Sequence, residues 1–207
     1  MKQRVLIWDL PTRFFHWLLV MNFFGAYFSG ESERWALIHI TCGFSVFGLI
    51  IFRLIWGLVG TRYARFTEFM RSPAKTIAYI KLSVQGHAKP YIGHNPAGAM
   101  AILCLLSLGI INCVSGWLLY EDIGWEWLET LHEQAALLML VVVILHVLGV
   151  LVSGRLHREN LIHAMLDGRK YADEQQAISN KHPLPAYLIL ISLAAFWVWS
   201  FKDVLAI

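Results

Sequence analysis

The chain has 207 residues, of which 57% are hydrophobic and 15% are charged, and its mean hydropathy is +0.56. Soluble domains carry about 25% charged residues, so this composition excludes an ordinary water-soluble globule and indicates a membrane protein. The net charge of +3 is small, so the distribution of charge matters more than its sum. The expected environment is a lipid bilayer, and no nucleic-acid partner is expected.

Five apolar segments follow one another along the chain, and a helix needs about 20 such residues to cross a bilayer core. They are residues 14–29, 35–58, 96–120, 131–153 and the shorter, uncharged 184–201. No long polar region remains for a second globular domain. The sequence therefore predicts an all-α, polytopic membrane protein with a four-helix transmembrane bundle in residues 1–168. A cytoplasmic linker and an extra C-terminal transmembrane helix would occupy residues 169–207.

Basic loop residues gather on one side of this predicted bundle, which sets its orientation by the positive-inside rule. They are Lys2, Arg4 and Arg13, then Arg62, Arg65, Arg71, Lys75, Lys81 and Lys89, and finally Arg155, Arg158, Arg169 and Lys170. The other two loops contain Glu31, Glu33, Arg34, Glu121, Asp122, Glu126 and Glu129. We therefore expect a multi-pass protein of the bacterial inner (cytoplasmic) membrane with a cytoplasmic N-terminus. No small-residue cleavage site follows Phe28, so the first helix is expected to remain uncleaved.

Four of the nine histidines, His16, His39, His132 and His146, lie in or at the ends of predicted spans, where ionisable residues are costly and mark functional sites. His132 and His146 are 14 residues apart. At 100° and 1.5 Å per residue they share nearly the same helix face and lie about 21 Å apart along its axis. One helix can thus give one ligand to each of two stacked sites. Matching depths pair His16 with His146 on the cytoplasmic side and His39 with His132 on the outer side.

Pairs of histidines fit two non-covalent haem b groups, because bis-histidine ligation suits one-electron transfer and disfavours oxygen binding. The chain has no C-x-x-C-H sequence, which excludes covalent haem attachment, and Cys42, Cys104 and Cys113 are expected to be buried thiols. A single histidine at the end of a span is more often an interfacial or hydrogen-bonded residue. Four at matched depths favour ligation, so residues 1–168 are predicted to form a dihaem core.

Two arginines are candidates for binding the propionates of the cytoplasmic haem. Arg13 stands three residues before His16, and Arg53 stands 14 residues after His39 on a similar helix face. The alternative is that each arginine snorkels to lipid phosphate. For Arg13 this explanation is about as good as propionate binding, and for the deeper Arg53 it is less good.

His94 precedes Asn95 and Pro96 at the start of the third span. Asn95 is expected to cap this helix and Pro96 to occupy its first turn. His94 itself could face a quinone headgroup or a haem edge. The other four histidines, His87, His157, His163 and His182, have polar, basic surroundings and are expected in solvated loops.

Several short stretches together resemble the bacterial cytochrome b561-type family, which includes the membrane cytochrome b subunits of nickel-iron hydrogenases. They are Trp8-Asp9, Arg-Phe-Phe-His-Trp at 13–17, Arg-Leu-Ile-Trp-Gly at 53–57, Ala-Arg-Phe at 64–66 and Gly-His-Asn-Pro-Ala-Gly at 93–98. The resemblance covers residues 5–168 and includes the 14-residue ligand spacing. It implies a four-helix dihaem core ligated by His16, His39, His132 and His146, and exchange with the quinone pool. The segment after Pro183 departs from the family pattern, and no residue of the family's quinone site is clear enough to transfer.

The leading hypothesis is a membrane dihaem cytochrome b that transfers electrons between the quinone pool and a redox partner. That partner would be a hydrogenase-like subunit, another dehydrogenase or reductase subunit, or a c-type cytochrome, and the chain would be an electron-transfer subunit rather than a stand-alone enzyme. A self-contained superoxide:quinone oxidoreductase is the first alternative, but acidic outer loops do not favour capture of an anion. A haem-free membrane anchor is the second, without a supporting motif. The acidic outer loops indicate a cationic periplasmic partner.

Overall fold

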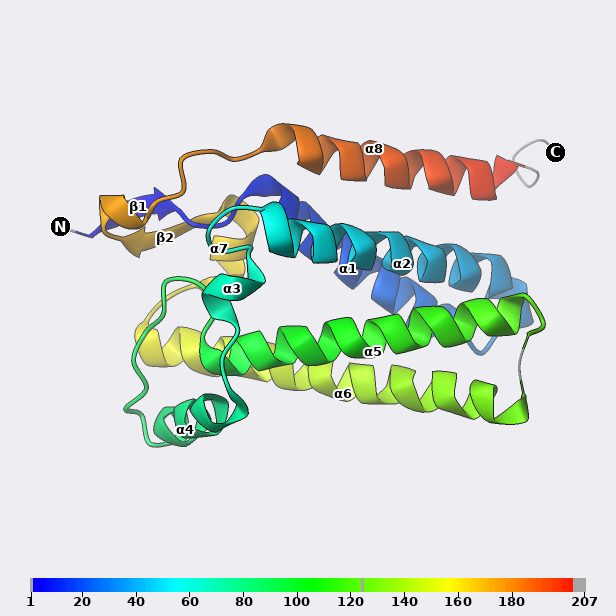
Figure 1. Ribbon diagram of the computed structural model, residues 1–207, viewed down its shortest axis with the longest axis horizontal. Coiled ribbons are helices and arrows are strands. Elements are labelled where there is room, and N and C mark those ends of the chain that lie inside the picture. Colours follow the sequence, from blue (N-terminus) through cyan, green and yellow to red (C-terminus); the bar gives the residue numbers. More distant parts are fainter. Residues whose placement is uncertain (1, 124, 203–207) are drawn as a thin grey trace.

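Five long helices run side by side in the computed structural model, which describes residues 2–123 and 125–202 (Figure 1). They are α1 (Leu10–Ser29), α2 (Ala36–Val59), α5 (Pro96–Tyr120), α6 (Glu126–His157) and α8 (Pro183–Ser200). The shorter elements are β1 (Gln3–Leu6), η1 (Glu33–Trp35), α3 (Phe66–Phe69), α4 (Pro73–Val84), α7 (Leu161–Asp167), β2 (Arg169–Ala172) and η2 (Glu174–Gln176). The predicted all-α class is confirmed, with one small sheet added.

Four of the long helices are long and apolar enough to cross a membrane: α2 taken with the turn η1 before it, α5, α6 and α8. The extra C-terminal segment is thus a helix of the expected kind. Helix α1 has 20 residues but is not among the four, and it contains the polar side chains of Arg13, His16 and Asn22. Its crossing of the membrane stays a prediction.

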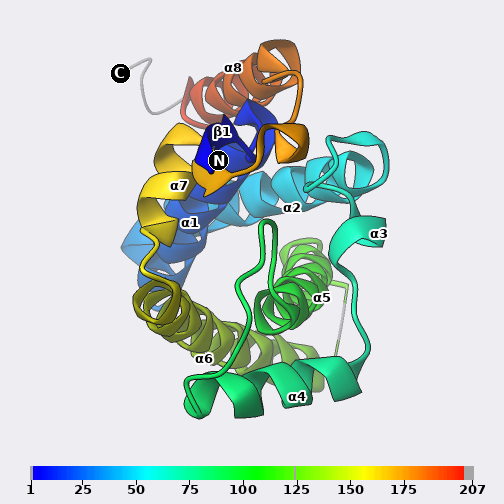
Figure 2. The same ribbon diagram turned by 90° about the vertical axis from the view of Figure 1, so that its left-hand side faces the viewer.

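The long helices pack in two neighbouring pairs, α1 with α2 and α5 with α6, and α2 also contacts α5 (Figures 1 and 2). Helix α8 lies against α1 and α2, where the indole N–H of Trp197 donates to Ser45 Oγ at 3.1 Å. The main apolar core joins α1, α2 and α5; its buried members are Phe15, Leu18, Val46, Leu49, Ile50 and Leu106. On α6, by contrast, Leu137, Leu138 and Leu145 are exposed, as expected for a surface that faces lipid. The pair of α1 and α2 is therefore joined to α6 mainly through α5.

A two-stranded antiparallel sheet closes one end of the bundle. Strand β1 pairs with β2 from Gln3 opposite Ala172 to Leu6 opposite Arg169. A buried cluster of Val5, Ile7, Trp8, Tyr63, Ala164 and Ala172 lies beneath it. The segment that was expected to be a linker therefore begins with a strand bound to the N-terminus.

The helix ends follow from local chemistry. Asn95 caps α5 as predicted, because its Oδ1 accepts from the N–H of Gly98 at 2.7 Å, and Pro96 occupies the first turn. Helix α6 is longer than the predicted 131–153, with acidic residues in its first turn and basic ones in its last, which the helix dipole favours.

Two of the histidines expected in loops lie in helices instead. His157 ends α6 and His163 lies in α7, so the expectation of loop positions for these two was wrong. His87 is exposed outside the helices, as expected, and His182 occupies the position just before α8 without a side-chain capping bond.

Candidate functional site

The four span histidines divide between the two ends of the bundle. We call the end with the β1–β2 sheet the strand end, and the end with the α1–α2 and α5–α6 turns the hairpin end (Figure 1). At the hairpin end, the rings of His39 on α2 and His132 on α6 have centroids 6.1 Å apart and an interplanar angle of 70°. Toward the strand end, His146 on α6 lies near enough to His16 on α1 for their charges to interact. The structure therefore brings together the same two pairs that matching depths indicated.

Backbone carbonyls hold both rings at the hairpin end. His39 Nδ1 lies 2.8 Å from the carbonyl oxygen of Ala26, and His132 Nδ1 lies 3.1 Å from that of Asn112. A carbonyl oxygen only accepts, so each ring donates from Nδ1–H and leaves Nε2 unprotonated. Unprotonated Nε2 with a hydrogen-bonded Nδ1 is the arrangement in which histidine ligates a metal.

Two glycines allow the close approach of these rings to neighbouring helices. A Cβ on Gly116 of α5 would lie 2.9 Å from Cε1 of His132, and a Cβ on Gly30, after α1, would lie 3.2 Å from Nδ1 of His39. Each ring is therefore confined by a glycine and held by a hydrogen bond.

The hairpin-end pair fits an iron held by two histidines. The pair bridges α2 and α6, which are joined mainly through α5. Bonds from imidazole nitrogen to a metal are about 2 Å long, so rings with centroids 6.1 Å apart leave room for one ion between them. Within residues 2–123 and 125–202 no group of three or more His, Cys, Asp or Glu side chains could hold a metal ion. A bis-histidine haem needs only two.

At the strand end, His94 lies between two aromatic rings. Its ring centroid is 4.6 Å from that of Trp8 and 4.6 Å from that of Phe69. Burial, together with the nearby charges of Arg53, His146, Lys170 and His16, lowers the pKa of His94 to about 3. The ring is therefore neutral at physiological pH, and its buried Nδ1 has no partner within the described chain.

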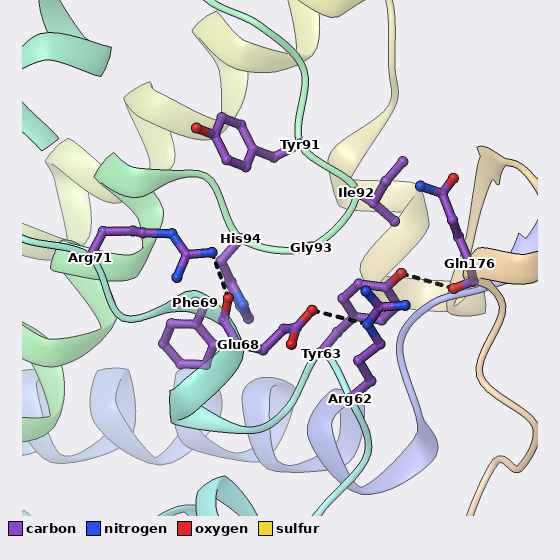
Figure 3. Close-up of a pocket in the computed structure, with 10 residues that line it drawn as sticks. All are labelled: Arg62, Tyr63, Glu68, Phe69, Arg71, Tyr91, Ile92, Gly93, His94 and Gln176. Atoms are coloured by element: carbon purple, nitrogen blue, oxygen red, sulfur yellow. Dashed lines mark hydrogen bonds and ion pairs between the residues drawn. The ribbon is translucent and has the colours of Figure 1, made fainter. Parts of the chain in front are cut away.

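His94 also lines a cavity of about 170 Å³ between the segment before α4 and the segment that leads into α5 (Figure 3). The other residues that line it include Tyr63, Tyr91 and Gln176 and the charged side chains of Arg62, Glu68 and Arg71 (Figure 3). A cavity of about 150 Å³ accepts one benzene ring, so this one is large enough for a single six-membered ring.

Arg53 is 3% exposed, which excludes snorkelling to lipid phosphate. Its Nη2 donates to the carbonyl oxygen of Ala64 at 3.0 Å, and its guanidinium lies 4.9 Å from the ring of Phe66. Nη1 is buried and has no partner within residues 2–123 and 125–202. A buried cation with a free N–H calls for an anionic acceptor, and a carboxylate such as a haem propionate suits it.

Asp9 is a buried carboxylate at this end to which the sequence assigned no role. It is 1% exposed and accepts from the N–H of Thr12 at 2.9 Å, the indole of Trp56 at 3.1 Å and the hydroxyl of Thr61 at 2.6 Å. Its charge acts on Arg13 and Arg53. Arg13 itself donates to the carbonyl oxygen of Leu166 and keeps a buried Nε without a partner in the described residues.

The apolar helices define a polytopic membrane protein, and its long helices carry paired histidines. A model of the prokaryotic cytochrome b561 family matches residues 7–168. The chain therefore belongs to the prokaryotic cytochrome b561 family. As a membrane b-type cytochrome it carries haem b and transfers electrons.

Three relatives are each named "Probable Ni/Fe-hydrogenase B-type cytochrome subunit". That of Azotobacter vinelandii is 25% identical over 219 residues, covering 83% of this chain and 90% of the relative. That of Rhodobacter capsulatus is 22% identical, covering 84% of each chain, and that of Rhizobium leguminosarum bv. viciae is 20% identical, covering 84% and 92%. No solved structure matches the chain.

Proposed function

We propose that this chain is a dihaem cytochrome b that carries electrons across the inner membrane between the quinone pool and a periplasmic redox partner. The observation that supports it most directly is the pair His39 and His132, whose ring centroids lie 6.1 Å apart and whose Nδ1 atoms are both bound to carbonyls. His16 and His146 form the second pair toward the other end of the bundle.

Each proposed haem, held by two histidines, would supply a reversible one-electron couple. At the hairpin end, the carbonyls of Ala26 and Asn112 fix the ligand rings. At the strand end, Arg53 would donate its free Nη1–H to a propionate, and Arg13 would add a second positive charge. Asp9 holds α1 and α2 together there through its bonds to Thr12 and Trp56.

The charges support an orientation with the strand end, and the N-terminus, in the cytoplasm. The loops at the strand end are basic and those at the hairpin end mainly acidic. The hairpin end would then meet the periplasmic partner, and its acidity suits a cationic surface. The names of the relatives favour a hydrogenase-like subunit as this partner, with a c-type cytochrome as the other candidate.

Quinone exchange is proposed at the strand end, where His94 and aromatic side chains line the 170 Å³ cavity. The unpartnered Nδ1 of His94 could bond a quinone carbonyl oxygen there, or contact a haem edge instead. The acidic hairpin end does not favour an anion such as superoxide, so no second function is proposed.

The test is haem quantitation on the purified chain in detergent, by the pyridine haemochrome method and by reduced-minus-oxidised spectra. We expect two haems b per chain, one after His132→Ala or His146→Ala, and two after the control His87→Ala, which changes an exposed loop histidine. Absence of haem, or a haem content indifferent to both ligand substitutions, contradicts the proposal.

A further inference from the structure

The two histidine pairs differ in what holds the second ring nitrogen. At the hairpin end, His39 and His132 each donate from Nδ1 to a backbone carbonyl. At the strand end, Nδ1 of His16 is buried and has no partner in the described part of the chain. The hairpin-end ligands are therefore polarised by the protein, and His16 is not.

This difference bears on redox potential. A hydrogen bond from the far nitrogen of a ligating imidazole makes the ring a more basic ligand. A more basic ligand favours the oxidised iron, because that state has the higher positive charge. Hydrogen bonding around the ligands is one of the means by which a protein sets the potential of a haem.

The charges near the two histidine pairs favour the same order of reduction potentials as the hydrogen bonds do. The carboxylate of Glu133, next to His132 in the chain, acts on that ring. At the strand end the positive charges of Arg53 and Lys170 act on His94, which also interacts with His16 and His146. The carboxylates there are Asp167 and Asp9, which act on Arg13, and Asp9 also acts on Arg53. Negative charge favours the oxidised state and positive charge the reduced state, by Coulomb's law.

We infer that the hairpin-end haem has the lower reduction potential of the two, set by the carbonyls of Ala26 and Asn112 together with the hydroxyl of Ser115. This inference rests on the proposed dihaem function. One electron would then pass downhill from the hairpin end to the strand end, with oxidation of the first iron, reduction of the second and no proton transfer. In the proposed orientation this direction leads from the periplasmic partner toward the quinone pool.

Ser115 is the part of this arrangement that a substitution can remove. Its hydroxyl lies 3.0 Å from His132 Nδ1 and donates to the carbonyl oxygen of Ile111 at 2.8 Å. The hydroxyl proton is thereby directed away from His132, so Oγ accepts from Nδ1–H as a second acceptor beside Asn112. Ser115 is 2% exposed and acts on the iron only through His132, which makes it a positioning residue.

The experiment is a redox titration of the purified holoprotein in detergent, followed at the haem absorbance bands. Ser115→Ala should raise the lower of the two potentials and leave the upper one unchanged. Loss of one hydrogen bond corresponds to about a threefold to tenfold change in the one-electron equilibrium, or about 30 to 60 mV. The matched control is Ser107→Ala, an exposed serine of the same helix, which should change neither potential.

Ligand substitutions assign the two components. His39→Leu should remove the lower-potential component and His16→Leu the higher one. Two haems with the reverse assignment, or a Ser115→Ala titration that matches the wild type, would refute the order of potentials and leave the dihaem function standing. Fewer than two haems in the wild type would refute both.

Discussion

Gly116→Ala tests the confinement of His132. The new methyl would lie 2.9 Å from Cε1 of His132, whereas ordinary van der Waals contact begins at 3.4 Å. The ring cannot retreat freely, because its Nδ1 is bound at 3.0 to 3.1 Å to Ser115 and Asn112 on the same helix as the methyl. Disturbing the partners that orient a metal ligand typically weakens metal binding by about 10- to 100-fold. We expect loss of one haem, or its retention with an affinity lower by that factor.

The measurement is haem per chain, with competition by apomyoglobin to compare affinities. The control is Gly48→Ala: nothing lies within 4 Å of its added Cβ, and nine residues of helix place it opposite His39 on α2. It should retain both haems. The reasoning about the glycine is refuted if Gly116→Ala keeps two haems at the affinity of the control.

Two further predictions concern the strand end. Asp9→Asn leaves the indole N–H of Trp56 without its carboxylate acceptor, and an unsatisfied buried group costs about 1 to 3 kcal/mol, so thermal unfolding in detergent should occur at lower temperature. For Asp167, burial raises the pKa, but the N–H of Arg169 and the charges of Arg4 and His163 outweigh it, so the pKa lies below the usual value. Its stabilisation of the β1–β2 sheet is therefore present above about pH 4 and lost as the pH falls further. Protease cleavage near the N-terminus should rise in acid in the wild type and change less with pH in Asp167→Asn; equal profiles would contradict this assignment.

The apolar helices and their order were predictable because each is long, uncharged over most of its length and separated by polar loops. The capping of α5 was also predictable, since Asn95 followed by Pro96 is a local pattern. The ends of α6 were missed because Glu126 and Arg155 lie outside the apolar stretch, and a hydropathy pattern does not record the helix dipole that favours them.

For the candidate site, the sequence yielded the histidine pairs from depth and spacing, whereas the groups around them depend on tertiary contacts. Ser115 and Gly116 contact His132 from another helix, and no local pattern marks that contact. The role of Asp9 was hidden for the same reason, since Trp56 and Thr61 reach it from far along the chain. A small polar residue inside an apolar span was the sole indication that sequence offered for Ser115.

The pairing of β1 with β2 restricts the number of membrane crossings between the two strands. Paired strands lie on the same face of a membrane, so an even number of crossings separates Leu6 from Arg169. Helices α2, α5 and α6 would give three crossings. Parity would therefore require α1 as the fourth despite its polar residues, and would place the residue after α8 on the face opposite the sheet.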